Sequence, residues 1–153
     1  MPVNQLTNFS GEENESQTIG HFELICQYDS SQSGNLVNGT LVAIESLSSS
    51  TSPILIKKAT TSPDFYMLGV VVNAPTGGVA PGGAVEVLTH GVVQCLFDAN
   101  NTTAGHLALQ SSTTAGCLTD SSTATLGKTM GTILQSVTIS SGTALVWVLV
   151  GKM

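Results

Sequence analysis

The sequence contains very little charge, and this scarcity limits the partners that it can bind. Only 9% of its 153 residues are Asp, Glu, Lys or Arg, against roughly a quarter in an ordinary soluble domain. Ten acidic residues face four lysines and no arginine, which gives a net charge of −6. Proteins that bind nucleic acid neutralise phosphates with Lys and Arg. We therefore expect no binding to DNA or RNA.

Cysteines and long apolar runs are also scarce. Cys26, Cys95 and Cys117 are an odd number at wide spacing, which fits neither a disulfide framework nor a zinc site. We expect them to be small buried hydrophobic residues, although a Cys95–Cys117 bridge is conceivable. No run of about 20 apolar residues is present, so we expect no transmembrane helix. The polar, acidic start has no signal-peptide pattern, and we expect assembly in a cytoplasm.

Aromatic residues make up only 5% of the chain. Trp147, Tyr28 and Tyr66 are the side chains that could stack on a sugar ring. Each falls in or beside an expected strand, which favours a place in the core. The sequence thus gives little support to a glycan-binding surface.

No group of residues predicts a catalytic, metal or cofactor site. His90 lies four residues from Glu86 on an expected strand, about 13 Å away, and we expect His21 and His106 at the surface or at strand ends. Asp98 and Asp120 end apolar segments at turns and are expected to cap them. No G-x-S-x-G motif occurs. A hydrolase would need a cleft that brings a histidine and an aspartate together.

The sequence is rich in short apolar segments that alternate with polar residues and are separated by glycine turns. This pattern predicts an all-β fold, a small barrel or sandwich. A hairpin with a tight turn at Ser140–Gly142 is expected near the end of the chain, and Lys57-Lys58 suits an edge strand. Strands are expected at residues 18–28, 40–47, 54–56, 65–73, 85–90, 92–97, 107–109, 116–118, 128–139 and 143–150.

The first 17 residues differ from the rest. They lack periodicity, carry an acidic cluster, and contain only three isolated large apolar side chains, Val3, Leu6 and Phe9. One interpretation is a disordered terminus. The other, which we prefer, is an arm (residues 1–17) that orders on a partner with these three side chains as anchors. Residues 18–153 are then one β-domain.

The order of motifs from residue 54 to 150 resembles that of the head decoration, or cement, proteins of tailed bacteriophages. The motifs are LGVVV, APGGAVEVLTHGVVQCLFD, AGHLALQSSTTAGCL, LGKTMGTIL and GTALVWVLV. The resemblance implies a β-tulip or barrel-like domain, commonly trimeric, at threefold or quasi-threefold positions on the outside of a mature capsid. It also implies the major capsid protein as partner, no cofactor, no enzymatic activity, and a terminal segment that reaches a neighbouring subunit. The alternative is a receptor- or glycan-binding module resembling a fibre tip.

Overall fold

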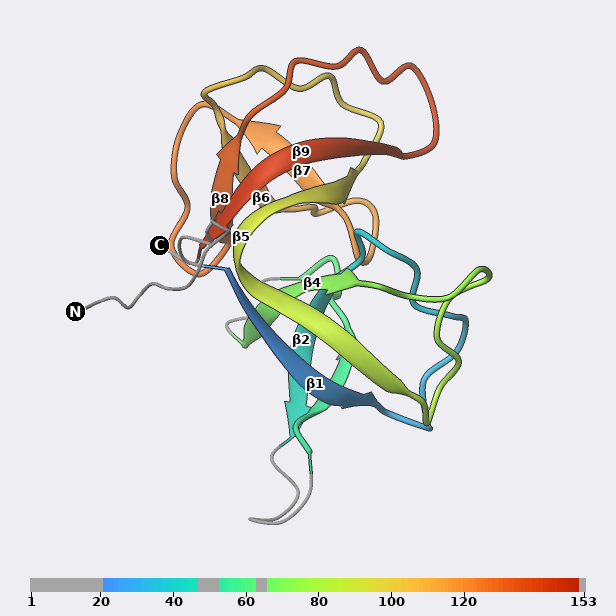
Figure 1. Ribbon diagram of the computed structural model, residues 1–153. Coiled ribbons are helices and arrows are strands. Elements are labelled where there is room, and N and C mark those ends of the chain that lie inside the picture. The colour runs from blue at the N-terminus through green and yellow to red at the C-terminus, as the bar shows by residue number, and fades with distance from the viewer. Residues whose placement is uncertain (1–20, 47–52, 63–65, 152–153) are drawn as a thin grey trace, which may run out of the picture.

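The structure, a computed structural model, describes residues 21–46, 53–62 and 66–151. Within these ranges the chain forms nine strands and no helix (Figure 1). The all-β fold predicted from alternation is confirmed. The strands are β1 (Phe22–Tyr28), β2 (Leu41–Ser46), β3 (Leu55–Lys58), β4 (Met67–Val72), β5 (Ala84–Phe97), β6 (Leu107–Gln110), β7 (Leu118–Ser121), β8 (Thr129–Ile133) and β9 (Ala144–Gly151).

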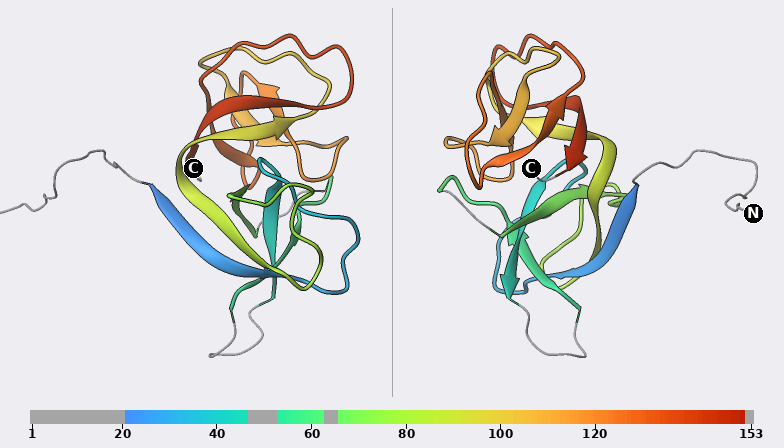
Figure 2. Two further views of the ribbon diagram at one scale, coloured as in Figure 1. Left: turned by 45° about the vertical axis from the view of Figure 1, so that its right-hand side comes forward. Right: turned by 90° about the vertical axis from the view of Figure 1, so that its left-hand side faces the viewer.

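The strands close into two five-stranded barrels that share β5 (Figure 2). The first barrel has the order β1-β3-β2-β4-β5 and closes through the antiparallel pair β1–β5. The second has the order β5-β7-β6-β8-β9 and closes through the antiparallel pair β5–β9. Residues 84–90 of β5 pair with β1, and residues 90–97 pair with β9. Closure leaves neither barrel with an open sheet edge among these strands.

The second barrel repeats the topology and the register of the first. The strands β5 to β9 take the places of β1 to β5. Each barrel contains one parallel strand pair, β1–β3 and β5–β7, and the pairing of Tyr28 with Ile56 corresponds to that of Phe97 with Leu118. Both barrels also have the same irregularity: the register shifts after Val42 between β2 and β4, and after Ala108 between β6 and β8. The described residues therefore form a tandem structural repeat, which was not predicted from the sequence.

Hydrogen bonds outside the strands repeat in the same way. Gly39 N donates to Val71 O at 2.9 Å, and Gly105 N donates to Ile133 O at 2.8 Å. Each barrel also has one isolated bridge in its loops, Leu36–Val79 in the first and Thr102–Val137 in the second. Residues at corresponding positions of the two barrels are called equivalent below.

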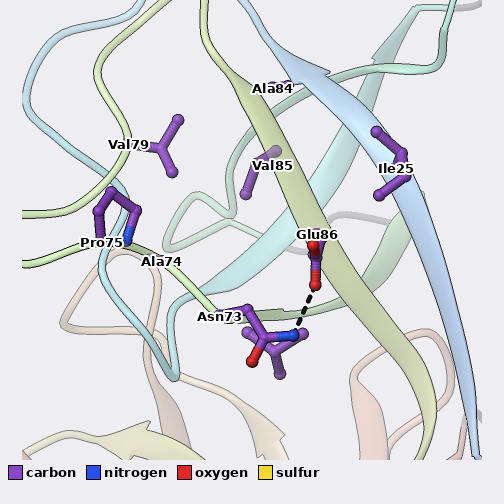
Figure 3. Close-up of a pocket in the computed structure, with 9 residues that line it drawn as sticks. Ile25, Asn73, Ala74, Pro75, Val79, Ala84, Val85 and Glu86 are labelled. Atoms are coloured by element: carbon purple, nitrogen blue, oxygen red, sulfur yellow. Dashed lines mark hydrogen bonds between the residues drawn. The ribbon is translucent and has the colours of Figure 1, made fainter.

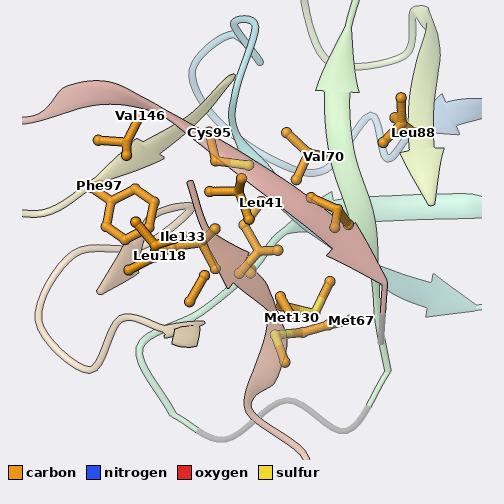
Figure 4. Close-up of a cluster of buried hydrophobic side chains, with 14 of the residues drawn as sticks. Leu41, Met67, Val70, Leu88, Cys95, Phe97, Leu118, Met130, Ile133 and Val146 are labelled. Atoms are coloured by element: carbon orange, nitrogen blue, oxygen red, sulfur yellow. The ribbon is translucent and has the colours of Figure 1, made fainter. Parts of the chain in front are cut away.

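The barrel interiors are filled mainly by small and β-branched side chains. The first core contains Cys26, Tyr28, Val42, Ile56, Val71, Val85 and Val87, together with Leu36. Equivalent positions form the core of the second barrel, namely Cys95, Phe97, Ala108, Leu118, Ile133, Val146 and Val148 (Figure 4). A five-stranded barrel has little interior room, which favours Val and Cys over larger residues.

The barrels pack against each other through the outer surface of the first. Five residues of the first barrel join the second core. One is Met67. The other four, here called the buried row, are Leu88 on β5, Val70 on β4, Leu41 on β2 and Ala59 directly after β3. Backbone hydrogen bonds reinforce the contact, with Leu41 N donating to Gly116 O and Gly116 N to Ala59 O, each at 2.8 Å. Leu96 N donates to Gly39 O at 2.9 Å. The row is buried, so the outside of the first barrel and the interior of the second form one hydrophobic cluster, whereas the interior of the first barrel is a separate one.

Three details of the prediction are wrong. Gly91 does not separate two strands; with φ +138° it lies inside the single strand β5. The strand that ends in Lys57-Lys58 is not at an edge, because β3 pairs with both β1 and β2. The last two strands do pair, but β8 ends at Ile133, so ten residues rather than a tight turn connect it to β9.

Candidate interaction surface

The main exposed apolar surface lies on the outside of the second barrel. Along β9, Val146, Val148 and Val150 point inward and are fully buried, whereas the residues between them point outward. The side chains that we call the apolar face are each 43–52% exposed; they are Val92, Leu134, Leu145, Trp147 and Leu149. The face lacks charge, so a partner could cover it without desolvating an ion.

Strand pairing makes this face continuous. Val92 on β5 pairs with Leu149 on β9, and Gln94 pairs with Trp147. On the other side of β9, Leu134 N donates a hydrogen bond to Trp147 O at 2.9 Å. Side chains directly opposite on neighbouring strands lie about 5 Å apart, so the five residues form one patch. A patch of this kind marks interaction sites more often than isolated exposed residues do.

A groove of about 350 Å³ runs where the apolar face meets the first barrel. Val92, Leu145 and Trp147 line one side, and the first barrel lines the other with Asn38, Gly39, Val71, Val72 and Asn73. A smaller hollow of about 130 Å³ lies beside it and shares Val72 and Asn73 (Figure 3). Asn73 Nδ2 donates to Glu86 Oε1 at 2.6 Å across this hollow. The larger groove extends the apolar face and has the wider opening for a partner side chain.

The placement of the aromatic residues corrects the sequence analysis. Tyr28 is in the core as expected, but Trp147 is 44% exposed and Tyr66 is 68% exposed. These two do not form a cluster. Trp147 lies beside the groove at Val71 and Val72, near the end of β4, whereas Tyr66 precedes the start of that strand. A strand rises about 3.3 Å per residue, so the two positions are about 20 Å apart along β4.

The structure brings together a histidine and an aspartate that the sequence analysis had treated separately. His106 Nδ1 lies 2.7 Å from Asp120 Oδ1, and Asp120 Oδ2 accepts a hydrogen bond from Thr103 N at 2.7 Å. Both contacts hold the turn before β6. The pair lines neither of the two grooves described above. Its local role is to fix this turn.

The other histidines lie apart from this pair. His90 packs edge-on against Phe22, with ring centres 6.3 Å apart. His21 Nε2 lies 2.8 Å from Glu23 Oε2 at the exposed start of β1. Both positions are at the exposed start or bend of a strand, as expected.

Asp98 is buried, and its carboxylate organises the loop between β6 and β7. Its Oδ2 accepts hydrogen bonds from Ser111 Oγ at 2.6 Å and from Thr113 Oγ1 at 3.3 Å. Its Oδ1 accepts one from Asn100 Nδ2 at 2.9 Å. These bonds account for a buried carboxylate in structural terms, as its expected capping role implies.

The three cysteines are free and buried, as expected, and the conceivable Cys95–Cys117 bridge is not formed. Burial raises the pKa of Cys26 and Cys117 to about 11 each, and raises that of Cys95 further. Such thiols are unreactive. Among the residues that the structure describes, no group of three or more His, Cys, Asp or Glu could hold a metal ion. The same part of the chain has no helix suited to crossing a bilayer.

The proposed arm, residues 1–17 with Val3, Leu6 and Phe9, lies outside the described residues. The sequence does not reveal the apolar face, because alternation does not show which side of a strand faces the core. The larger side chains of β9 were the natural core candidates. The pairing of β9 with β5 and β8 places them outside.

Comparison with known proteins finds a likeness of fold only. No protein-family model matches the sequence. No curated protein is similar to it in sequence. The fold is similar to that of the N base of the head fiber protein gp8.5 in bacteriophage phi29, with a TM-score of 0.51 and 14% identity. The likeness covers 87% of this chain and 98% of that one. Over 87% of its length, the chain therefore has a fold similar to that of a protein from a phage head fiber.

Proposed function

We propose that this protein is a non-enzymatic structural protein of a phage virion that binds the outside of the head. The observation that carries the proposal is the fold likeness to the head fiber base, which spans 98% of that chain. The order of glycine and valine motifs, which resembles that of decoration proteins, supports it independently. The low surface charge and the apolar face suit a protein that works through broad contacts.

In its finer form, the proposal is a decoration or cement protein. It binds the major capsid protein on the capsid exterior and bridges adjoining subunits as a trimer. Binding to the assembled shell but not to its separated subunits stabilises the shell by mass action, by about 2.7 kcal/mol per site at a hundredfold excess over Kd. Three linked contacts add avidity. The arm, with Val3, Leu6 and Phe9, is proposed to reach a neighbouring subunit.

The test is binding to heads that lack this protein. Purified protein is mixed with such heads, and co-sedimentation and the temperature at which the heads release their DNA are measured. We expect binding and a higher release temperature. Protein that stays in the supernatant at every concentration contradicts the proposal.

The arm is tested in the same assay with the combined substitutions Val3→Ser, Leu6→Ser and Phe9→Ser. Leu126→Ser is the matched control, because Leu126 is a large apolar residue, 92% exposed, in the loop between β7 and β8. The arm variant should bind more weakly and the control normally. Equal binding of both variants would show that the arm is not an anchor.

A second candidate function, a receptor- or glycan-binding module, has one observation in its favour: the exposure of Trp147 beside a groove. Sugar-binding sites commonly use an exposed aromatic ring. The distance between Trp147 and Tyr66 counts against a shared aromatic platform. A glycan array separates the two functions: selective binding that is lost in Trp147→Ala, without binding to heads, favours this alternative.

A further inference from the structure

The repeat allows each surface of one barrel to be compared with the same surface of the other. The buried row of the first barrel crosses three neighbouring strands in register, Leu41 with Val70 and Val70 with Leu88. Ala59 N donates to Leu41 O at 3.0 Å and continues the row. All four side chains are covered by the second barrel.

The equivalent row of the second barrel, here called the open row, is less covered: Leu149 is exposed and the other three side chains are half-buried, whereas the buried row is almost fully buried. Its pairing is the same, since Leu107 pairs with both Ser121 and Thr132, and Thr132 pairs with Leu149. Leu88 is 1% exposed, whereas the equivalent Leu149 is 45% exposed. The open row continues into the apolar face through Leu149 and Val92.

Two equivalent glycines show the same contrast. A Cβ built on Gly39 would lie 2.6 Å from Leu145 Cδ2, because the second barrel packs directly on that turn. A Cβ built on Gly105 would have no atom within 4 Å. The second barrel covers the surface of the first barrel around Gly39. The equivalent surface of the second barrel, around Gly105, is open.

The buried row is received by one end of the second barrel. Met130 belongs to the same buried cluster as the row, Val93 packs against that cluster, and Gly116 bonds to Leu41 and Ala59. The equivalent residues at the first barrel are Leu68, Leu24 and Ile54. Met130 is fully buried, but Leu68 and Ile54 are half-buried and Leu24 is 39% exposed. The first barrel thus has a receiving end with exposed apolar side chains.

We propose that the open row of one copy docks on the receiving end of the first barrel of a second copy. The contact between copies then imitates the contact between barrels within the chain. It joins two different surfaces, so it repeats head to tail and gives a ring where the rotation closes. Copies with a net charge of −6 repel one another, and uncharged faces such as these allow close approach.

The sequence of the open row fits a surface that is sometimes exposed. Leu107 and Leu149 keep the leucines of the buried row, Leu41 and Leu88. Ser121 and Thr132 stand where the buried row has Ala59 and Val70, which preserves their size and adds a hydroxyl group. These hydroxyls make the free row wettable, whereas the leucines retain the apolar contact.

The proposed contact between copies resembles the contact between barrels in its side chains but not in its backbone hydrogen bonds. In the second barrel, Leu96 N donates to Gly39 O, so the first barrel enters the seam between β5 and β7. In the first barrel the equivalent donor, Gln27 N, bonds to Ile54 O at 2.9 Å and closes the seam between β1 and β3. The contact between copies therefore lacks these backbone bonds, and it should be weaker than the contact between barrels.

The inference deepens the proposed trimer by naming the surfaces that join its copies, and to that extent it rests on the proposed function. The test uses full-length protein without capsids, and the mass in solution is measured by sedimentation over a range of concentrations. We expect the wild type to form a closed oligomer. A monomeric wild type that still binds heads refutes this inference alone, and an oligomer that does not bind heads refutes only the proposed function.

Two arginine substitutions test the two surfaces separately. Leu149→Arg places a charge in the open row, and Leu24→Arg places one at the receiving end. Each should weaken self-association at least about a hundredfold, because it buries an unpaired charge. The control is Leu126→Arg, in a loop outside both surfaces, which should keep the wild-type mass. A Leu149→Arg variant with the wild-type mass overturns the proposal.

Mixing the two variants tests the head-to-tail arrangement. Each variant alone should be monomeric, but a mixture should form a one-to-one dimer, because one copy supplies an intact open row and the other an intact receiving end. A mixture that remains monomeric contradicts the arrangement. Circular dichroism checks folding, and Leu24→Ser replaces Leu24→Arg if the latter unfolds, since it removes the apolar side chain at the same position of the receiving end, which is 39% exposed.

Discussion

Leu88 and Leu149 are the same residue at equivalent places in the two barrels, and they make a matched pair for mutation. Leu88 is 1% exposed and lies between the barrels, whereas Leu149 is 45% exposed. Truncation of a buried leucine to alanine removes its burial energy and leaves a cavity, at a cost of about 2–5 kcal/mol. At a half-exposed position the loss should be less than about 1 kcal/mol. The difference measures how firmly the barrels are packed together.

The assay is urea denaturation of Leu88→Ala and Leu149→Ala, followed by circular dichroism at a dilution where copies do not associate. We expect a large fall in the transition midpoint for Leu88→Ala and a small one for Leu149→Ala, with similar slopes. Equal losses of unfolding free energy would refute the reasoning, because they would mean that the buried row is no better covered than the open row.

Three further predictions concern single residues. Gly131→Ala should destabilise the protein by about 1–3 kcal/mol or more in thermal unfolding, because the added methyl group overlaps the carbonyl oxygen of Leu149 on the neighbouring strand. Asp98→Ala should lower the free energy of unfolding by about 1–3 kcal/mol, because it leaves the buried Ser111 hydroxyl without this acceptor; an unchanged urea midpoint would contradict this. Burial raises the pKa of Cys26 and Cys117 from 9.0 to about 11, so the contribution of these two thiols to stability should be constant below pH 9 and fall as the pH rises from 9 through 11. Denaturation at several pH values checks this, and iodoacetamide should not label these thiols in the folded protein at pH 8.

The sequence was sufficient for the fold class because alternation of apolar residues is a local property. The predicted bounds of β1, β2, β4 and β9 agree with the structure to within a few residues. The predicted break between two strands at Gly91 is wrong. A glycine between two apolar segments usually marks a turn, whereas here it allows one strand to bend. Pairing with β1 and β9 on either side of this residue keeps the strand continuous.

The repeat and the apolar face could not be predicted because both depend on pairing between distant segments. Equivalent positions share geometry more than residue type: Glu86 and Trp147 occupy the same place in the two barrels, as do Val70 and Thr132. The inward side of β9 is set by the width of the barrel, which accepts Val146 and Val148 and turns Trp147 outward. Neither effect is visible in the local pattern.

The shared strand β5 has a mechanical consequence. The strands β1, β4 and β9 all pair with β5, which is one continuous strand. A force that separates β1 or β4 from β5 should therefore also weaken the pairing of β5 with β9. Among the described residues, the two halves are connected by this continuous strand, without a loop between them. A load applied at either end is thus borne by both barrels together, and the molecule should give way in a single step.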